Sequence, residues 1–346
     1  MSIRLRLILV ALIALTVASV TAYWFHVAGQ MRKGIESFVE QRRAEGWVVE
    51  LSPIRMGGFP LSVKAGLDNI RLAPPGGIAW RADSVTVILP LTDPLTIAVD
   101  SPGFHRLMSP NWSGILSTRS AQARIHLSTQ GKITAIAFEG STLALEQPGI
   151  DPLIAASFTL GVDWLNPPDP GHEKPSLALT LALRGLDLPD LSGLPLARRM
   201  ESFQVEARLM GNLPDSPPLA SLAAWSADGG TLELDRISLD WPPLTLDANG
   251  TLALDPGLQP LLATTARIRG GGEFIVRLVQ AGLVEPGMAE AAKIMLALLA
   301  RPDAQGRPTL TLPLTLQDGI LTAGQVRVLK LSPVPVPPPY SGGHAP

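Results

Sequence analysis

Apolar residues form one unbroken run near the start of the chain. From Leu7 to Phe25 there are 19 residues without a charge, close to the ~20 that cross a bilayer core as a helix. The run ends in Tyr23, Trp24 and Phe25, the residue types that gather at a membrane-water interface. The pattern predicts a transmembrane helix at 7–27, preceded by a cytoplasmic head at 1–6.

The apolar pattern continues past this run at helical spacing, through Met31, Ile35, Phe38 and Val39. It predicts an amphipathic helical continuation at 28–45.

After residue 46 the dominant period changes to two, so that apolar and polar residues alternate. The segments with the cleanest alternation are 61–67, 158–164, 177–183, 203–209 and 310–316. Such alternation is typical of antiparallel sheets with one apolar face, because parallel strands covered on both faces give unbroken apolar runs. We expect about twelve to sixteen strands.

One passage near the C-terminus has helical spacing instead. Glu273–Leu283 and Met288–Ala300 predict two helices, with Gly282 and Pro286 marking the break between them. The predicted fold class is therefore dominated by β-structure with minor α. It comprises the transmembrane helix, then an elongated, curved antiparallel sheet or sandwich, with one helical hairpin.

The region 46–332 reads as one β-rich exported domain. Residues 140–152 resemble residues 250–260, which leaves open either two similar halves, about 46–165 and 176–332, or two strand ends with the same turn chemistry. From residue 333 to 346 the proline-rich composition predicts a disordered tail.

The apolar run has a second interpretation, a cleaved secretory signal. Arg4 and Arg6 form a positive head, and Val20-Thr21-Ala22 supplies small residues for a peptidase. We favour the anchor, because the run exceeds the ~7–15 residues of a signal core. Basic residues lie on both sides of the span, so the positive-inside rule does not decide which end of the helix faces the cytoplasm. We expect a single-pass inner-membrane protein with its bulk in the periplasm.

Charge and composition exclude several classes of function. The net charge is −2, so no basic field favours nucleic acid. The chain has no cysteine, which excludes disulfides and thiolate chemistry.

The remaining polar residues give no recognisable catalytic, cofactor or metal motif. The five histidines are isolated, without the spacing that places two ligands on one helix face; we expect surface or loop positions, with His126 on the solvent side of a strand. Most aspartates lie beside turn residues. We therefore predict no catalytic residues, no cofactor, no metal and no enzymatic activity.

A short motif follows the predicted helix. Gly46-Trp47 precedes a strand, and Gly57-Gly58-Phe59-Pro60 interrupts two strands. Glycine adopts backbone angles that other residues avoid, and proline removes an amide donor. We expect these six residues to have a structural role in turning the chain as it leaves the membrane.

These residues also carry a resemblance. Gly46-Trp47, Gly57-Gly58-Phe59-Pro60-Leu61 and Leu67-x-x-Ile70-x-Leu72, placed directly after a membrane helix, resemble a bacterial family known as domain of unknown function 2125. The later stretches Trp241–Asp255 and Leu312–Gly324 extend the resemblance, and they are also more loosely similar to AsmA-like envelope proteins with β-sheet grooves. The resemblance implies a membrane-anchored envelope protein, and it supplies no activity.

The sequence leaves three functional hypotheses. The first is a noncatalytic protein that shelters lipid or another hydrophobic ligand in a groove of the sheet. The second is a scaffold for envelope proteins, and the third is an enzyme. We expect the groove lining to include Leu177, Leu179, Leu181, Leu310, Leu312 and Leu314.

Overall fold

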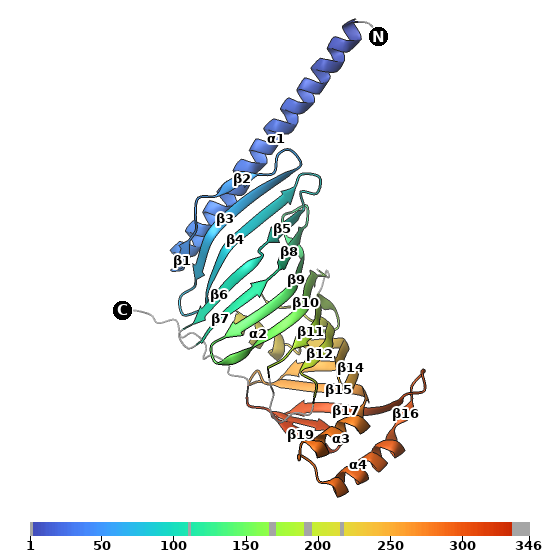
Figure 1. The fold of residues 1–346 in the computed structure, drawn as a ribbon. Coiled ribbons are helices and arrows are strands. Elements are labelled where there is room, and N and C mark those ends of the chain that lie inside the picture. The colour runs from blue at the N-terminus through green and yellow to red at the C-terminus, as the bar shows by residue number, and fades with distance from the viewer. Residues whose placement is uncertain (1–2, 110–111, 166–170, 190–195, 215–217, 334–346) are drawn as a thin grey trace, which may run out of the picture. The chain divides into compact units, whose positions relative to one another are not determined.

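The computed structural model describes residues 3–109, 112–165, 171–189, 196–214 and 218–333. The chain divides into two compact units, Met1–Ser157 and Phe158–Pro346. The division falls within strand β10 (Ile150–Trp164). The described residues form nineteen strands and four helices (Figure 1), and the predicted fold class is confirmed. The predicted tail at 333–346 lies almost wholly outside the described residues.

The first unit contains helix α1 and nine complete strands. Their bounds are α1 (Ile3–Ala44), β1 (Val48–Glu50), β2 (Arg55–Gly57), β3 (Ser62–Ala73), β4 (Ala79–Pro90), β5 (Thr96–Asp100), β6 (Gly103–Ser109), β7 (Trp112–Thr118), β8 (Ser120–Leu127) and β9 (Ile133–Gln147).

These nine strands form an antiparallel sheet in which one edge of a long strand can pair with two short strands at different points along its length. β1 and β2 both pair with β3, which pairs with β4 on its other side. β4 pairs with β5 and β6 at different points of its length. β5 then pairs with β8, β6 with β7, and both β7 and β8 with β9.

Helix α1 has one half without packing partners and one half that packs on the sheet. Residues 3–20 are all exposed, and this is the part long and apolar enough to cross a membrane. From Trp24 onward, Trp24, Ala28 and Val39 are buried at helical spacing. Trp24 and Ala28 form a core with the fully buried Val63 of β3. The first half of α1 is therefore suited to a lipid environment, and the second half is part of the folded unit.

The second unit is built on an antiparallel meander. After β10 its elements are β11 (Pro175–Asp187), β12 (Arg199–Met210), α2 (Pro218–Ala227), β13 (Thr231–Trp241), β14 (Leu244–Leu254), β15 (Pro260–Arg269), α3 (Gly271–Gln280), α4 (Pro286–Leu299), β16 (Arg301–Pro302), β17 (Pro308–Gln317), β18 (Ile320–Ala323) and β19 (Val326–Lys330).

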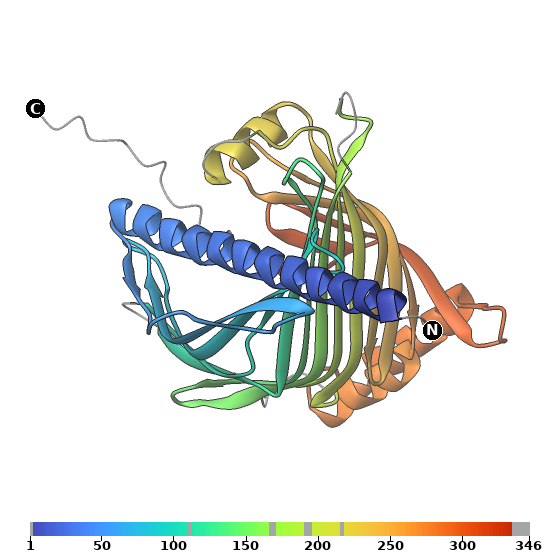
Figure 2. The same cartoon turned by 90° about the horizontal axis from the view of Figure 1, so that it is seen from above.

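Strands β11 to β15 pair in sequence order, and β15 then pairs with β17 across the helical hairpin. β17 continues to β18 and β19. Figure 2 shows the strands from β12 to β15 as long curved ribbons running side by side.

The helices of the second unit connect ends of strands. Within α2, the Trp225 indole nitrogen donates to the Met210 carbonyl oxygen at 2.8 Å, and the Ser226 hydroxyl donates to the Leu254 carbonyl oxygen at 3.0 Å. This helix therefore closes the ends of β12 and β14. The helical hairpin α3–α4 follows β15 and confirms the helical passage expected from the sequence.

Two details differ from the sequence-based expectation. Nineteen strands are present among the described residues instead of twelve to sixteen, because β1, β2 and β16 have only two or three residues and are too short to show alternation. Helix α2 was not expected, because Pro217-Pro218 reads as a turn, whereas Pro218 opens the helix, a position that proline tolerates.

Candidate functional site

One face of the second unit is apolar across six strands. The backbone register places four residues of each strand in cross-strand rows. The first row is Leu177, Leu209, Leu232, Leu252, Leu262 and Leu316; the second is Leu179, Ala207, Leu234, Gly250, Thr264 and Leu314; the third is Leu181, Val205, Ile237, Ala248, Ala266 and Leu312; the fourth is Leu183, Phe203, Leu239, Leu246, Ile268 and Leu310. We call these residues the apolar face.

The apolar face is graded in burial. The buried members are mostly small or central, namely Ala207, Leu234, Ala248, Thr264 and Ala266, together with Leu316. The larger leucines at both margins, including Leu179 and Leu314, are half-buried. Side chains in a closed sandwich core would be fully buried from both sheets, so the margins keep apolar surface that a ligand could cover.

A close approach of two backbones flattens the middle of this face. A Cβ atom added to Gly250 of β14 would lie 2.1 Å from the Ala263 carbonyl oxygen of β15. Only glycine fits between strands at this distance, so the second row has no side chain at its centre.

The opposite face of the same strands is polar. It carries ion pairs between neighbouring strands, among them Arg208 with Asp235 and Arg269 with Asp247. The Arg208 guanidinium hydrogen-bonds the Asp235 carboxylate, and this holds the pKa of that carboxyl below its usual range. The strands therefore separate an apolar side from a hydrated side, as the alternation predicted.

The six expected groove residues occupy two margins of the apolar face. Leu177, Leu179 and Leu181 lie on β11, and Leu310, Leu312 and Leu314 on β17. All six are half-buried. The register places both sets on the same face, but four strands lie between them, which is on the order of 24 Å at ~4.8 Å per strand step. The residues of the intervening strands β12 to β15 were not predicted as groove lining, although β13 to β15 carry the same alternation.

The motif after α1 forms two turns. Gly46, at φ +84°, ends the helix: its amide donates to the Arg43 carbonyl oxygen at 3.0 Å, and the Trp47 amide donates to the Arg42 carbonyl oxygen at 3.0 Å. This is the double hydrogen bond of a Schellman motif. The Arg42 guanidinium lies 5.6 Å from the Trp47 ring centroid and covers it.

The second turn joins β2 to β3. Gly57 is the last residue of β2, and Gly58 follows at φ +92°. Phe59, Pro60 and Leu61 form the exposed tip. The Phe59 ring centroid lies 5.8 Å from that of Trp24 in an edge-on arrangement, and the Trp24 indole nitrogen donates to the Ser62 carbonyl oxygen at 2.7 Å. The turn is therefore fixed against α1.

The histidines separate into buried and exposed cases. His126 is exposed on β8, as expected. The expectation of a surface or loop position for His105 was wrong: this residue is buried on β6, with its ring stacked on Trp80 at 6.0 Å. Its Nε2 lies 2.9 Å from the Ser101 carbonyl oxygen, and the Trp80 indole nitrogen donates to its Nδ1 at 3.3 Å. Both ring nitrogens of His105 therefore have a hydrogen-bonding partner within the first unit.

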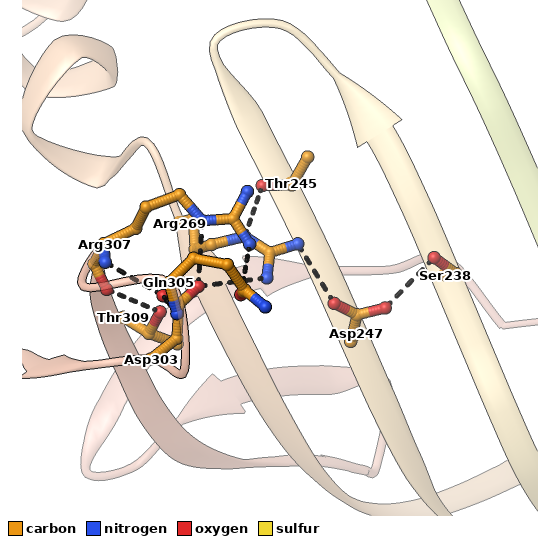
Figure 3. Close-up of polar contacts among 8 residues, drawn as sticks. All are labelled: Ser238, Thr245, Asp247, Arg269, Asp303, Gln305, Arg307 and Thr309. Carbon is orange, nitrogen blue, oxygen red and sulfur yellow. Dashed lines mark hydrogen bonds and ion pairs between the residues drawn. The ribbon is translucent and has the colours of Figure 1, made fainter.

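A polar network ties the loop between β16 and β17 to the sheet (Figure 3). The Asp303 Oδ1 accepts the amides of Gln305 and Arg307 at 2.9 and 2.8 Å. The amide of Arg307, above all, holds the pKa of the Asp303 carboxyl below its usual range. Arg269 reaches the same carboxylate at 3.8 Å, and it donates to Asp247 at 3.2 Å.

Within the described part of the chain, no three side chains of His, Asp or Glu gather as metal ligands would. The polar side of the second unit carries charge pairs between strands, such as Arg208 with Asp235. Its apolar side offers dispersion and desolvation, which suit an apolar ligand.

A comparison with protein families matches residues 24–332 to the model described as "uncharacterized protein conserved in bacteria", domain of unknown function 2125. No curated protein and no solved structure matches the chain significantly, so the looser likeness to AsmA-like proteins has no support from these comparisons. The match begins at Trp24, where α1 starts to pack on the sheet, and covers both units. The chain therefore belongs to this uncharacterized bacterial family, domain of unknown function 2125.

Proposed function

We propose that this protein is a membrane-anchored envelope protein that shelters a lipid or another hydrophobic ligand on the apolar face of its second unit. The observation that carries the proposal is the set of four continuous cross-strand rows, whose marginal leucines are only half-buried. Removing apolar surface from water is favourable by ~25 cal/mol of free energy per Å². An acyl chain laid across these rows would provide that cover.

The anchor in this proposal is α1. Its first 18 described residues, 3–20, are all exposed, and this apolar surface is suited to lipid. The proposed location is the inner membrane of a bacterium with two membranes, with both units in the periplasm. Support for the uncleaved anchor comes from the continuity of α1 through Trp24 into the sheet core.

The proposal assigns no catalytic step. Sheltering requires only a dry surface and a way to enter it, and the polar groups on the hydrated face serve in strand-to-strand pairs such as Arg208 with Asp235. The perturbed carboxyls, Asp235 and Asp303, owe their shifted pKa values to these pairs and to a loop.

The test is mass spectrometry of lipids that co-purify with residues 24–331, exported to the periplasm and isolated without detergent. The segment starts at Trp24 because Trp24, Ala28 and Val39 cover part of the sheet. We expect a stoichiometric lipid class in the unaltered segment, and a loss of most of it in Leu179→Lys, which places a charge on the apolar face.

Thr180→Lys is the matched control. Thr180 is the next residue of the same strand, is exposed, and faces Glu206 of β12 on the polar side. It should keep the lipid. A folded Leu179→Lys segment that retains the full lipid content would contradict the proposal, as would an unaltered segment that is stable and free of lipid.

A second function, an envelope scaffold, is favoured by one observation. Helix α4 packs through Ala289, which is buried, but it exposes Met288, Ile294, Met295 and Leu298, the last at 80%. Contiguous exposed apolar residues on one helix are typical of protein interfaces. If the lipid measurement is negative, α4 is the surface on which crosslinking to envelope proteins should begin.

A further inference from the structure

We propose that the turn between β2 and β3 enters the membrane interface beside α1 and gives the first unit a second contact with the lipid bilayer. The residues concerned are Phe59, Pro60 and Leu61. The inference rests on the proposed bilayer anchor, because α1 fixes where the interface lies.

The level of this turn follows from its contacts with α1. The uncharged run from Leu7 to Phe25 spans about 28 Å at ~1.5 Å per residue, so it fills a bilayer core of ~30 Å and places Trp24 at its outer edge. Trp24 donates to the Ser62 carbonyl oxygen, and its ring contacts Phe59. The turn therefore lies at the same level as the aromatic belt.

The direction of the sheet points the turn toward the bilayer. The Ser62 end of β3 lies at Trp24, while its Ala73 end pairs with Val48, just after the C-terminus of α1. β3 therefore runs beside α1 away from the membrane, and the residues before Ser62 form the end nearest to it. In Figure 1, α1 continues past this end of the sheet.

The side chains of the turn between β2 and β3 are apolar and unusually exposed. Phe59 is 52% exposed and Leu61 is 71% exposed, and no charged residue occurs from Met56 to Val63. The neighbouring turn after β4 adds the exposed Leu95 and also carries the exposed Asp93. Its Leu91, whose amide donates to the Leu61 carbonyl oxygen at 2.9 Å, packs on the core formed by Trp24, Ala28 and Val63. Exposure of these apolar side chains to water is unfavourable, whereas their partial burial at a membrane interface lowers the free energy.

The geometry has a consequence for how the first unit stands on the membrane. One helix alone leaves a domain free to tilt and rotate about the bilayer normal. A second apolar contact, fixed to α1 through Trp24, holds the strands of the first unit end-on to the surface. Apolar material leaving the bilayer would then meet the end of the sheet directly.

The chain has no cysteine, so single cysteines can be placed without removing native ones. The experiment labels Leu61→Cys, and separately Phe59→Cys, of the full chain with an environment-sensitive fluorophore in phosphatidylcholine vesicles. Ile78→Cys is the control: it is also an exposed apolar residue, at 54%, but it lies beyond the far end of β3, which is about 36 Å long at ~3.3 Å per residue.

We expect blue-shifted emission at positions 59 and 61, with quenching by lipids carrying a nitroxide near the headgroup that is several-fold stronger than quenching by aqueous iodide. Position 78 should show the reverse. The Leu61 side chain is the more informative of the two, because its exposure lets a label replace it without disturbing the contact of Phe59 with Trp24.

Val20→Cys, within the proposed span, separates this inference from the anchor. If position 20 is quenched by lipid while positions 59 and 61 behave as position 78 does, the anchor stands and the second contact is overturned. If position 20 itself is quenched by iodide, the anchor fails and the inference fails with it.

Discussion

Gly57 and Gly58 are adjacent in the sequence but differ in what a side chain would meet. A Cβ atom on Gly57 has open space around it, whereas one on Gly58 would lie 2.7 Å from the Ser62 carbonyl oxygen. Gly58 also has φ +92°, which other residues rarely adopt. A side chain would therefore be strained at position 58 but not at position 57.

We expect Gly58→Ala to lower the free energy of unfolding by about 1–3 kcal/mol, because both the backbone angle and the added methyl group are unfavourable. Gly57→Ala, the matched control, should stay within about 0.5 kcal/mol of the unaltered chain. The measurement is the urea midpoint of the tryptophan fluorescence. Equal effects of the two changes would show that the turn is not held as described.

At the level of single elements, the loop 303–307 between β16 and β17 shows how one carboxylate organises a hairpin. Asp303 accepts two loop amides and contacts the side chains of Arg307 and Arg269. Because its pKa is lower in the folded chain than its usual value, its ionised form stabilises the fold above pH ~4, and this stabilisation is lost as the pH falls through the folded pKa.

We expect Asp303→Asn to lower the melting temperature at pH 7, with a difference from the unaltered chain that shrinks as the pH drops below about 4. Arg307→Ala removes the side-chain partner but keeps the loop amides, which are the main cause of the lowered pKa. It should therefore keep most of the pH dependence. A difference for Asp303→Asn that is independent of pH would contradict this assignment.

Elements differ in how far the sequence predicts them. β3, β11, β12 and β17 follow from alternation because each has one apolar and one wet face. The register between strands does not follow, because it depends on bulges such as the shift between Leu234 and Ile237. Local pattern cannot show that both leucine margins face the same side, which is settled only by adding the pairings of six strands.

Contacts between distant segments were equally beyond the sequence. The hydrogen bond from Trp24 to Ser62 joins residues 38 positions apart, and the aromatic cluster near the membrane gave no sign of it. The stacking of His105 on Trp80 arises in the same way. An isolated histidine on an alternating strand is usually solvated, whereas here the neighbouring indole and the Ser101 carbonyl oxygen together make its burial favourable.

At the scale of the whole molecule, α1 combines a half that is long and apolar enough to cross a membrane with a half that packs on a folded unit. Its exposed first half has no packing partner among the described residues, while Trp24 and Ala28 belong to the core of the sheet. A peptidase cutting after Ala22 would leave Trp24 as the second residue of the mature chain. The packed half would persist, but the unit would lose its attachment.

We therefore expect the mature protein to retain the segment up to Ala22, because α1 is continuous through this position and does not offer the extended chain that a peptidase binds. The measurement is the intact mass of the protein extracted from the membrane fraction after an alkaline carbonate wash. A mass including the residues before Tyr23, in the washed membranes, supports the anchor. A soluble periplasmic chain beginning at Tyr23 would show a cleaved signal, and the end-on contact of Phe59 and Leu61 with a bilayer would then have no helix to hold it in place.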